Sequence, residues 1–187
     1  MINIKIDSRK IKPGDTFVAI PGATVDGHDF IGKAIEAGAT KVVVEHDVDC
    51  SVEKLIVEDT NKWLTDHISE TYSKEINEMN IIGVTGTNGK TTSAYLIYQA
   101  LNKLGIKTAY IGTIGFYMNG KVKDLPNTSV DICDTYNLLM EAYYNGYKTV
   151  VLEVSSHALA NNRLCTLKFD YGVFTNLTQD HLDFHKT

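Results

Sequence analysis

Apolar and polar positions alternate along this chain in blocks that predict short strands followed by helices. Ile2, Ile4 and Ile6 lie on one face of the first predicted strand, because successive strand side chains point to opposite faces. Apolar residues with helical spacing begin at Phe30, and Asp29 is the predicted N-cap of that helix. The predicted strands are 2–6, 16–20, 41–45, 55–57, 81–84, 108–111, 148–154 and 171–175, and the predicted helices are 30–37, 61–72, 92–104 and 132–144.

This alternation predicts an α/β fold with a mostly parallel sheet and right-handed crossovers. The charged residues 74–78 predict a solvated connector, and the most strongly apolar strand starts just after Met79. We therefore expect two domains, a small α/β domain at residues 1–79 and a second, parallel-sheet domain at residues 80–187. Residues 112–131 are expected to form a functional loop, since loops of that length are otherwise uncommon.

The amino-acid composition limits the classes of function that this chain can have. The 187 residues are 43% hydrophobic and 22% charged, which suits a folded core, and the net charge of -5 provides no basic surface for nucleic acid or an anionic membrane. No apolar run is long enough to span a bilayer. Three widely spaced cysteines, Cys50, Cys133 and Cys165, predict reduced thiols. We expect a cytoplasmic protein that acts as a monomer, with no nucleic-acid or membrane partner.

The residues 80–92 read as a buried strand, a glycine loop and the start of a helix. Gly86 and Gly89 can adopt the positive φ angles of a tight loop, and Lys90 stands at the mouth of the following helix. A helix N-terminus with free N–H groups and an adjacent lysine binds phosphate, and the Thr91 hydroxyl is placed to bind a phosphate-bound Mg²⁺. The predicted ATP-binding residues are Gly86, Thr87, Asn88, Gly89, Lys90, Thr91 and Thr92.

This loop departs from the general P-loop at one position, because Val84 stands where that spacing has glycine. The alternative is an ordinary strand-to-helix turn that happens to contain a lysine. Strand, loop, lysine, hydroxyl and helix all follow in the required order, and we therefore favour the phosphate loop.

Polar residues also follow two other predicted strands, and the carboxyl ends of parallel strands meet at one edge of a sheet. Glu153 closes one strand, and Asn176 and His181 follow another. Glu153 is expected to bind Mg²⁺ or hold a water molecule, although pairing with a nearby lysine is the alternative. His181 and His185 have a spacing that could bind zinc, but the glutamate of the usual zinc motif is missing and neighbouring aspartates favour a harder metal.

Three motifs of the second half and three of the first together resemble the Mur ligases, the ATP-dependent enzymes that build the peptide of bacterial cell-wall precursors. The motifs are Gly-Thr-Asn-Gly-Lys-Thr-Thr at 86–92, Glu-Val-Ser-Ser-His-Ala-Leu at 153–159, Phe-Thr-Asn-Leu-Thr-Gln-Asp-His-Leu-Asp-Phe-His at 174–185, Asp-Ser-Arg at 7–9, Pro-Gly-Asp-Thr-Phe-Val-Ala at 13–19 and Asp-Gly-His at 26–28. The first-half motifs resemble the members that add the third residue of the peptide, meso-diaminopimelate or L-lysine.

The resemblance implies roles for residues that the local pattern leaves open. Asp7, Ser8 and Arg9 read by themselves as a turn, whereas the resemblance implies that Ser8 and the turn of Ala23, Thr24 and Val25 contact the uridine nucleotide of a UDP-MurNAc-dipeptide substrate. It further implies a set of contacts to the muramoyl-peptide. These are Thr128, Ser129, Ser156 and Arg163. Relatives often have proline where this chain has Val130.

The implied reaction uses ATP to convert the substrate carboxylate into an acyl phosphate, which the incoming amino acid then attacks. Lys90 would stabilise the transferred phosphate, Thr91 and Glu153 would bind one Mg²⁺, and His181 a second, so that Lys90, Glu153 and His181 are the predicted catalytic residues. Such catalysis consists mostly of positioning and charge neutralisation.

One departure affects the activity expected of this chain. Relatives carry a carbamylated lysine and a third, amino-acid-binding domain beyond the segment with which this sequence ends, and we therefore expect a truncated central domain and an inactive chain. The alternatives are another ligase of the superfamily, such as a D-glutamate-adding ligase or a folylpolyglutamate synthase, or a non-catalytic nucleotide-binding module.

Overall fold

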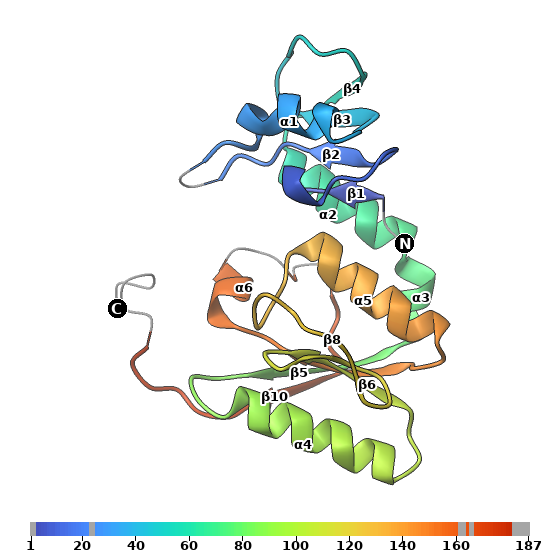
Figure 1. Ribbon diagram of the computed structural model, residues 1–187. Helices are drawn as coiled ribbons and strands as arrows, with labels where there is room; N and C mark the ends of the chain where they lie inside the picture. The colour runs from blue at the N-terminus through green and yellow to red at the C-terminus, as the bar shows by residue number, and fades with distance from the viewer. Residues whose placement is uncertain (1–2, 23–24, 161–163, 165–166, 181–187) are drawn as a thin grey trace. The chain divides into compact units, whose positions relative to one another are not determined.

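The computed structural model describes residues 3–22, 25–160, 164 and 167–180 of the 187-residue chain. The chain divides into two compact units, the N-terminal unit of residues 1–71 and the C-terminal unit of residues 72–187. Each unit has its own sheet, and Figure 1 shows the elements by label. Both units are mixed α/β structures with mostly parallel strands, as the pattern predicts.

The N-terminal unit is built on a four-stranded parallel sheet in the order β1-β2-β3-β4. Its elements are β1 (Ile4–Lys5), η1 (Ser8–Lys10), β2 (Thr16–Val18), η2 (Gly27–Phe30), α1 (Ile31–Glu36), β3 (Lys41–Val44), β4 (Glu53–Ile56) and α2 (Thr60–Thr71). Phe17 and Val42 pack with Ile31 of α1 on one face of the sheet. Val18 and Val43 alternate with them and are fully buried toward the other face.

The start of α2 is fixed by a buried threonine. The Thr60 hydroxyl lies 2.9 Å from both the Ala19 carbonyl and Glu45 Oε1, and its backbone N–H donates to the same Glu45 oxygen. Thr60 is fully buried, so these contacts satisfy polar groups that solvent cannot reach. The helix start is thereby joined to the ends of β2 and β3.

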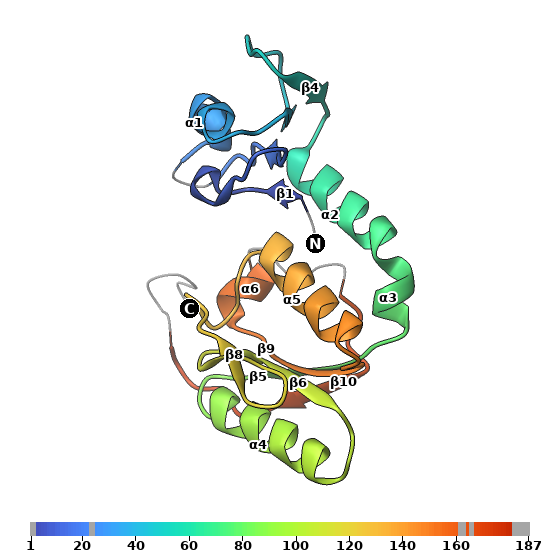
Figure 2. The same cartoon turned by 45° about the vertical axis from the view of Figure 1, so that its right-hand side comes forward.

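The C-terminal unit contains a six-stranded sheet in the order β10-β5-β9-β6-β7-β8. The first four strands in this order are parallel, and β7 and β8 are antiparallel additions. Its elements are α3 (Ser73–Asn77), β5 (Asn80–Thr85), α4 (Lys90–Lys103), β6 (Thr108–Gly112), β7 (Gly115–Tyr117), β8 (Lys121–Lys123), α5 (Ile132–Tyr144), β9 (Thr149–Glu153), α6 (Ser156–Ala160) and β10 (Tyr171–Phe174). Figures 1 and 2 show α4 on one face of this sheet and α5 on the other.

The centre of this sheet is apolar on both faces, which is typical of parallel strands covered by helices. Val84, Val151 and Tyr110 pack with Ala94 and Tyr98 of α4. The three central strands therefore lie in fixed register, and their carboxyl ends are held side by side.

Three local expectations are wrong. The segment 112–131 is not a plain loop, because it contains the β7–β8 hairpin, in which Gly115 at the start of β7 and Gly120 in the turn have positive φ angles. The residues 74–78 belong mostly to the short helix α3 rather than to a connector. Asp29 is not the N-cap of α1; a 3-10 turn capped by Asp26 precedes that helix.

Two features bear on the remaining expectations. Cys50 and Cys133 are free thiols, whereas Cys165 lies outside the described residues. Within the described ranges, the helices are too short or too polar to cross a lipid bilayer.

Candidate functional site

The phosphate loop lies between β5 and α4, as the sequence predicts. Gly86 has a φ of 132° and Gly89 a φ of 82°, values that a residue with a side chain rarely adopts. Gly89 is the N-cap of α4, and no side chain caps this end of the helix. The first N–H groups of α4 therefore face the loop, with the positive end of the helix dipole behind them.

Lys90 lies against the backbone of this loop. Its Nζ donates to the carbonyl oxygens of Gly86 at 2.7 Å and Thr87 at 2.9 Å. An ammonium group has three N–H donors. The two loop carbonyls fix the position of the charge and leave a third donor for an anionic ligand.

The loop is bonded to the segment that follows β10. The Asn88 N–H donates to Asn176 Oδ1 at 3.0 Å, and Asn176 Nδ2 donates to the Asn88 carbonyl at 3.0 Å. Thr175 Oγ1 donates to the same carbonyl at 2.7 Å, and the Thr87 N–H donates to the Asn176 carbonyl at 2.9 Å. A Cβ on Gly86 would lie 2.1 Å from Thr175 Oγ1, so only glycine permits this approach.

Glu153 ends β9, the strand next to β5, and its side chain is fully buried. Thr91 Oγ1 donates to its Oε2 at 2.9 Å. Oε2 also accepts from Thr113 Oγ1 at 3.0 Å, and Oε1 accepts from the Thr113 N–H at 3.1 Å and from the Tyr110 hydroxyl. The lysine pairing considered from the sequence is not made by any described residue, because hydroxyl and amide donors surround this carboxylate instead.

Tyr110 and Thr113 are site residues that the sequence reasoning missed. Burial, together with the hydrogen bond to Glu153, raises the pKa of the Tyr110 phenol, so it remains a donor at neutral pH. Thr113 directly follows β6, which pairs with β9, and the rule that polar residues gather at carboxyl ends of strands would have identified it. Tyr110 gives no such signal, because its position in an apolar strand is typical of a core residue. The close approach also requires Gly112, where a Cβ would lie 2.2 Å from Glu153 Oε1.

Two of the predicted muramoyl-peptide contacts, Thr128 and Ser129, are hydrogen-bonded to Thr113 and to the Glu153 backbone. Thr128 Oγ1 is 3.0 Å from Thr113 Oγ1. Ser129 is 5% exposed, and its hydroxyl donates to the Glu153 carbonyl and accepts from the Ser155 N–H. Ser129 therefore joins the 112–131 segment to the end of β9, whereas Ser156 is exposed at the start of α6.

The donor set fits a magnesium ion bound together with phosphates. Thr91 Oγ1 and Glu153 Oε2 are both oxygen atoms and lie 2.9 Å apart at the mouth of the phosphate loop. Mg²⁺ commonly takes one or two protein oxygens and completes its shell with phosphate oxygens and water. No cluster of three or more His, Cys, Asp or Glu side chains suited to a metal occurs among the described residues.

In the N-terminal unit, the turn at Asp7, Ser8 and Arg9 forms a 3-10 turn. Asp7 accepts from the Arg9 N–H at 3.0 Å and pairs with its guanidinium, which lowers the pKa of Asp7. Ser8 is half-buried at the start of this turn. The turn expected from local pattern is confirmed, and Ser8 lies just after the carboxyl end of β1.

The Asp-Gly-His motif has a structural role. His28 Nε2 accepts from the Glu45 N–H at 3.0 Å, so the ring proton is on Nδ1, which lies 2.7 Å from Asp26 Oδ1. Gly27 donates to the Ile20 carbonyl at 3.0 Å. These bonds hold Gly27 against Ile20 and His28 against Glu45, and Val25 is 53% exposed.

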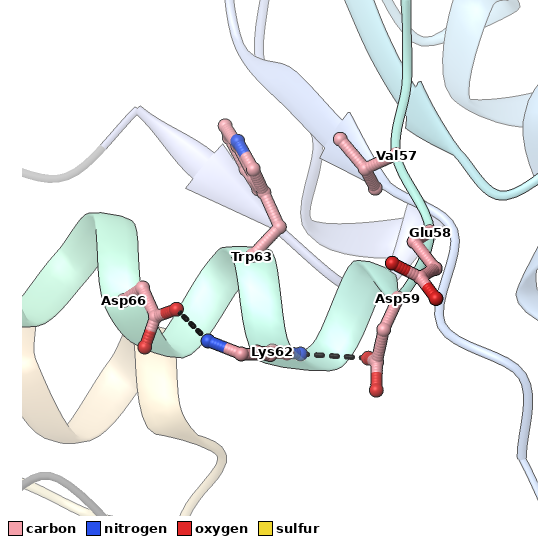
Figure 3. Close-up of a pocket in the computed structure, with 6 residues that line it drawn as sticks. All are labelled: Val57, Glu58, Asp59, Lys62, Trp63 and Asp66. Atoms are coloured by element: carbon pink, nitrogen blue, oxygen red, sulfur yellow. Dashed lines mark hydrogen bonds and ion pairs between the residues drawn. The ribbon is translucent and has the colours of Figure 1, made fainter.

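A hollow of about 510 Å³ lies beside the start of α2. It is lined by Val57, Glu58, Asp59, Lys62, Trp63 and Asp66. Figure 3 shows the Lys62 side chain reaching toward Asp66, while its backbone N–H donates to Asp59 at 2.8 Å. Three carboxylates outnumber the single ammonium, so this hollow does not suit a diphosphate.

Several predicted site residues lie outside the described residues: Ala23, Thr24, Arg163 and His181, together with His185. Of the three polar strand ends expected to gather, the described members do so, because β10, β5 and β9 are neighbours and carry Asn176, the phosphate loop and Glu153.

Comparison with known proteins places both units in one family. Residues 84–187 match the Mur ligase middle domain, and residues 2–81 match the catalytic domain of the Mur ligase family. The chain is 44% identical to a UDP-N-acetylmuramoyl-L-alanyl-D-glutamate--2,6-diaminopimelate ligase of Clostridium perfringens, over 99% of this chain and 39% of that protein. It is 45% identical to the ligase of the same name from Aquifex aeolicus, over 98% of this chain and 38% of that protein.

Solved structures give the same result. The match to a solved structure of a UDP-N-acetylmuramoyl-L-alanyl-D-glutamate--2,6-diaminopimelate ligase covers 100% of this chain and 38% of that protein, with a TM-score of 0.76 and 28% identity. The match to a MurF ligase from Thermotoga maritima, solved in complex with ADP, covers 98% of this chain and 39% of that protein, with a TM-score of 0.64 and 26% identity. The chain thus spans less than two fifths of the length of these relatives. With both of its units matched and with relatives 44% and 45% identical over nearly its whole length, this chain belongs to the Mur ligase family.

Proposed function

We propose that this chain supplies the uridine-nucleotide-binding and ATP-binding units of a ligase that adds 2,6-diaminopimelate to UDP-N-acetylmuramoyl-L-alanyl-D-glutamate. The observation that carries the proposal is the Thr91–Glu153 pair beside the phosphate loop, in a chain 44% identical to a ligase of that name. The reaction would proceed through an acyl phosphate formed from ATP, as in the Mur ligases generally.

ATP would bind with its phosphates at the start of α4. The N–H groups of this first turn, the dipole of a 14-residue helix and the remaining donor of Lys90 converge there. Lys90 would neutralise charge on the transferred phosphate without leaving the loop, because its two carbonyl contacts already direct it. Electrostatic stabilisation of this kind is the main contribution in phosphoryl transfer.

Thr91 and Glu153 would hold Mg²⁺, which supplies charge neutralisation to the phosphates when bound. Glu153 is suited to this role because its orientation is fixed by Tyr110 and Thr113 and it cannot turn to solvent. His181 is proposed as the ligand of a second Mg²⁺ on the resemblance alone. Thr92, the last residue of the loop motif, is exposed at the start of α4.

Contacts to the substrate are proposed within each unit by itself. Ser8 and residues Ala23, Thr24 and Val25 are the proposed contacts for the uridine nucleotide. Ser8 follows the carboxyl end of the parallel strand β1, and ligands of such sheets bind at these strand ends. Thr128, Ser129, Ser156 and Arg163 are the proposed contacts for the muramoyl-peptide. Of these, Thr128 is best placed to offer a hydroxyl, because the Ser129 hydroxyl already makes two hydrogen bonds.

Calorimetry on the 187-residue chain tests this proposal. The titrants are MgATP and UDP-N-acetylmuramoyl-L-alanyl-D-glutamate, added separately. We expect both to bind, the substrate in the submicromolar-to-micromolar range. Binding of ATP with no binding of the substrate would instead indicate a nucleotide-binding module, and binding of neither would refute the proposal.

Phosphate release provides a second test. The 187 residues correspond to less than two fifths of the length of these relatives. With ATP, substrate and 2,6-diaminopimelate, we expect these residues by themselves to release phosphate no faster than they do without the amino acid. Release above that background would contradict the expectation that this chain is inactive by itself.

A further inference from the structure

Thr113 contacts two residues to which different ligands are assigned above. Its hydroxyl lies 3.0 Å from Glu153 Oε2, beside the phosphate loop, and 3.0 Å from Thr128 Oγ1, on the proposed substrate segment. Its backbone N–H donates to Glu153 Oε1 at 3.1 Å. Thr113 thus holds both oxygens of the carboxylate and one substrate-segment hydroxyl.

The chemistry of these groups fixes the direction of the hydrogen bonds. A carboxylate only accepts, so the single hydroxyl proton of Thr113 is donated to Glu153. The oxygen of Thr113 is then the acceptor in its contact with Thr128, and Thr128 is the donor. A directed chain therefore runs from Thr128 through Thr113 to Glu153, and Thr91 donates to the same carboxylate oxygen.

We propose that Thr113 is a positioning residue that fixes Glu153 for the magnesium–nucleotide site and transmits to it the state of Thr128. The proposal deepens the proposed function and rests on it. Thr113 needs no contact with ATP or substrate. Its effect arises because hydrogen bonds in a chain strengthen one another, so a change at one end alters the other.

Two consequences follow. Removing the Thr113 hydroxyl frees one side of Glu153 and loosens a magnesium-binding oxygen, and loss of such outer partners typically lowers metal affinity 10-fold to 100-fold. A substrate group that accepts the Thr128 proton draws it from Thr113, so substrate and magnesium nucleotide alter each other's affinity by the same factor.

The test is calorimetry with ATP on the 187-residue chain, at zero and at saturating Mg²⁺, each with and without UDP-N-acetylmuramoyl-L-alanyl-D-glutamate. The variants are Thr113→Val, which keeps the shape, and Thr113→Ser, which keeps the hydroxyl. Thr113 is exposed, so neither change should prevent folding. Thr40→Val, at an exposed threonine of the N-terminal unit, is the matched control.

For Thr113→Val we expect unchanged affinity for ATP without Mg²⁺, because the loop amides and Lys90 are intact. The factor by which Mg²⁺ raises the affinity for ATP should fall about 10-fold to 100-fold. Adding the substrate should no longer change the affinity for ATP in the presence of Mg²⁺. Thr113→Ser and Thr40→Val should behave as wild type.

Three results would overturn the inference alone. The first is a wild-type chain that binds both ligands without mutual effect, and the second is a Thr113→Val variant that matches wild type in every condition. An equal loss of affinity with and without Mg²⁺ would indicate a merely structural role and would also overturn it. A wild-type chain that binds neither ligand would refute the proposed function itself, and the inference with it.

Discussion

Gly112→Ala should damage the site by adding a single methyl group. A Cβ at this position would lie 2.2 Å from Glu153 Oε1, 2.5 Å from the Tyr110 hydroxyl and 2.6 Å from Glu153 Cδ. Gly112 has no positive φ, so backbone strain plays no part in the effect. The methyl group acts only through the space that it takes.

The size of the effect follows from the contacts. To reach an ordinary van der Waals distance, the carboxylate oxygen would have to retreat by roughly 1 Å. Glu153 is fully buried and cannot turn to solvent, so the displacement weakens the bonds from Tyr110 and Thr113. Overpacking typically costs about 1–3 kcal/mol and a weakened bond to a charged group adds to that. We expect a loss of about 2–4 kcal/mol in the free energy of unfolding.

Urea unfolding followed by circular dichroism measures this loss, and calorimetry with ATP and Mg²⁺ measures the effect on the site, for which we expect about 10-fold to 100-fold weaker binding. Gly172→Ala in β10 is the matched control, because Gly172 is exposed, has no positive φ and has nothing within 4 Å of its added Cβ. That variant should unfold within about 0.5 kcal/mol of wild type. A Gly112→Ala protein as stable as the control, with wild-type affinity for magnesium nucleotide, would refute the steric argument.

Three further predictions concern other parts of the chain. Lys90→Ala should abolish detectable ATP binding in calorimetry, whereas Lys103→Ala at the far end of α4 should not; unchanged binding by the first variant would exclude the role assigned to that lysine. Thr60→Val should lower the free energy of unfolding by about 1–3 kcal/mol, because a buried carbonyl and a carboxylate lose their hydroxyl partner, and a smaller loss in urea titration would show that this contact is dispensable. The Lys148 ammonium lowers the pKa of Glu78. Their pair therefore stabilises the fold at pH values above the ordinary glutamate pKa, and this stability is lost as the pH falls through the lowered pKa. The difference in urea midpoint between wild type and Lys148→Met should vanish in acid, and a difference independent of pH would contradict this.

The phosphate loop could be predicted from sequence because each of its requirements is local. Gly86 and Gly89 supply positive φ angles, and Lys90 and Thr91 follow at the helix start. The position of Glu153 was equally accessible, since a single acid ended an apolar strand and parallel strands bring their carboxyl ends together.

The missed features depend either on contacts between distant segments or on elements too short to show a sequence pattern. Tyr110 looks like a core residue until β6 is paired with β9, which brings its hydroxyl to Glu153. The β7–β8 hairpin was missed because each strand has only three residues, and β8 is fully exposed. Asp29 and Asp26 both precede apolar helical spacing, and only the 3-10 turn at 27–30 determines that Asp26 is the cap.

The two hydrogen bonds between the Asn88 backbone and the Asn176 side-chain amide have a consequence for the thermodynamics of ligand binding. They continue the pairing of β5 and β10 beyond the ends of both strands, so the sheet itself determines the shape of the phosphate loop. Ordering the backbone of a free loop costs about 1–2 kcal/mol per residue in conformational entropy. Because this loop is already ordered in the folded chain, nucleotide binding loses less conformational entropy and its affinity is higher than for a free loop.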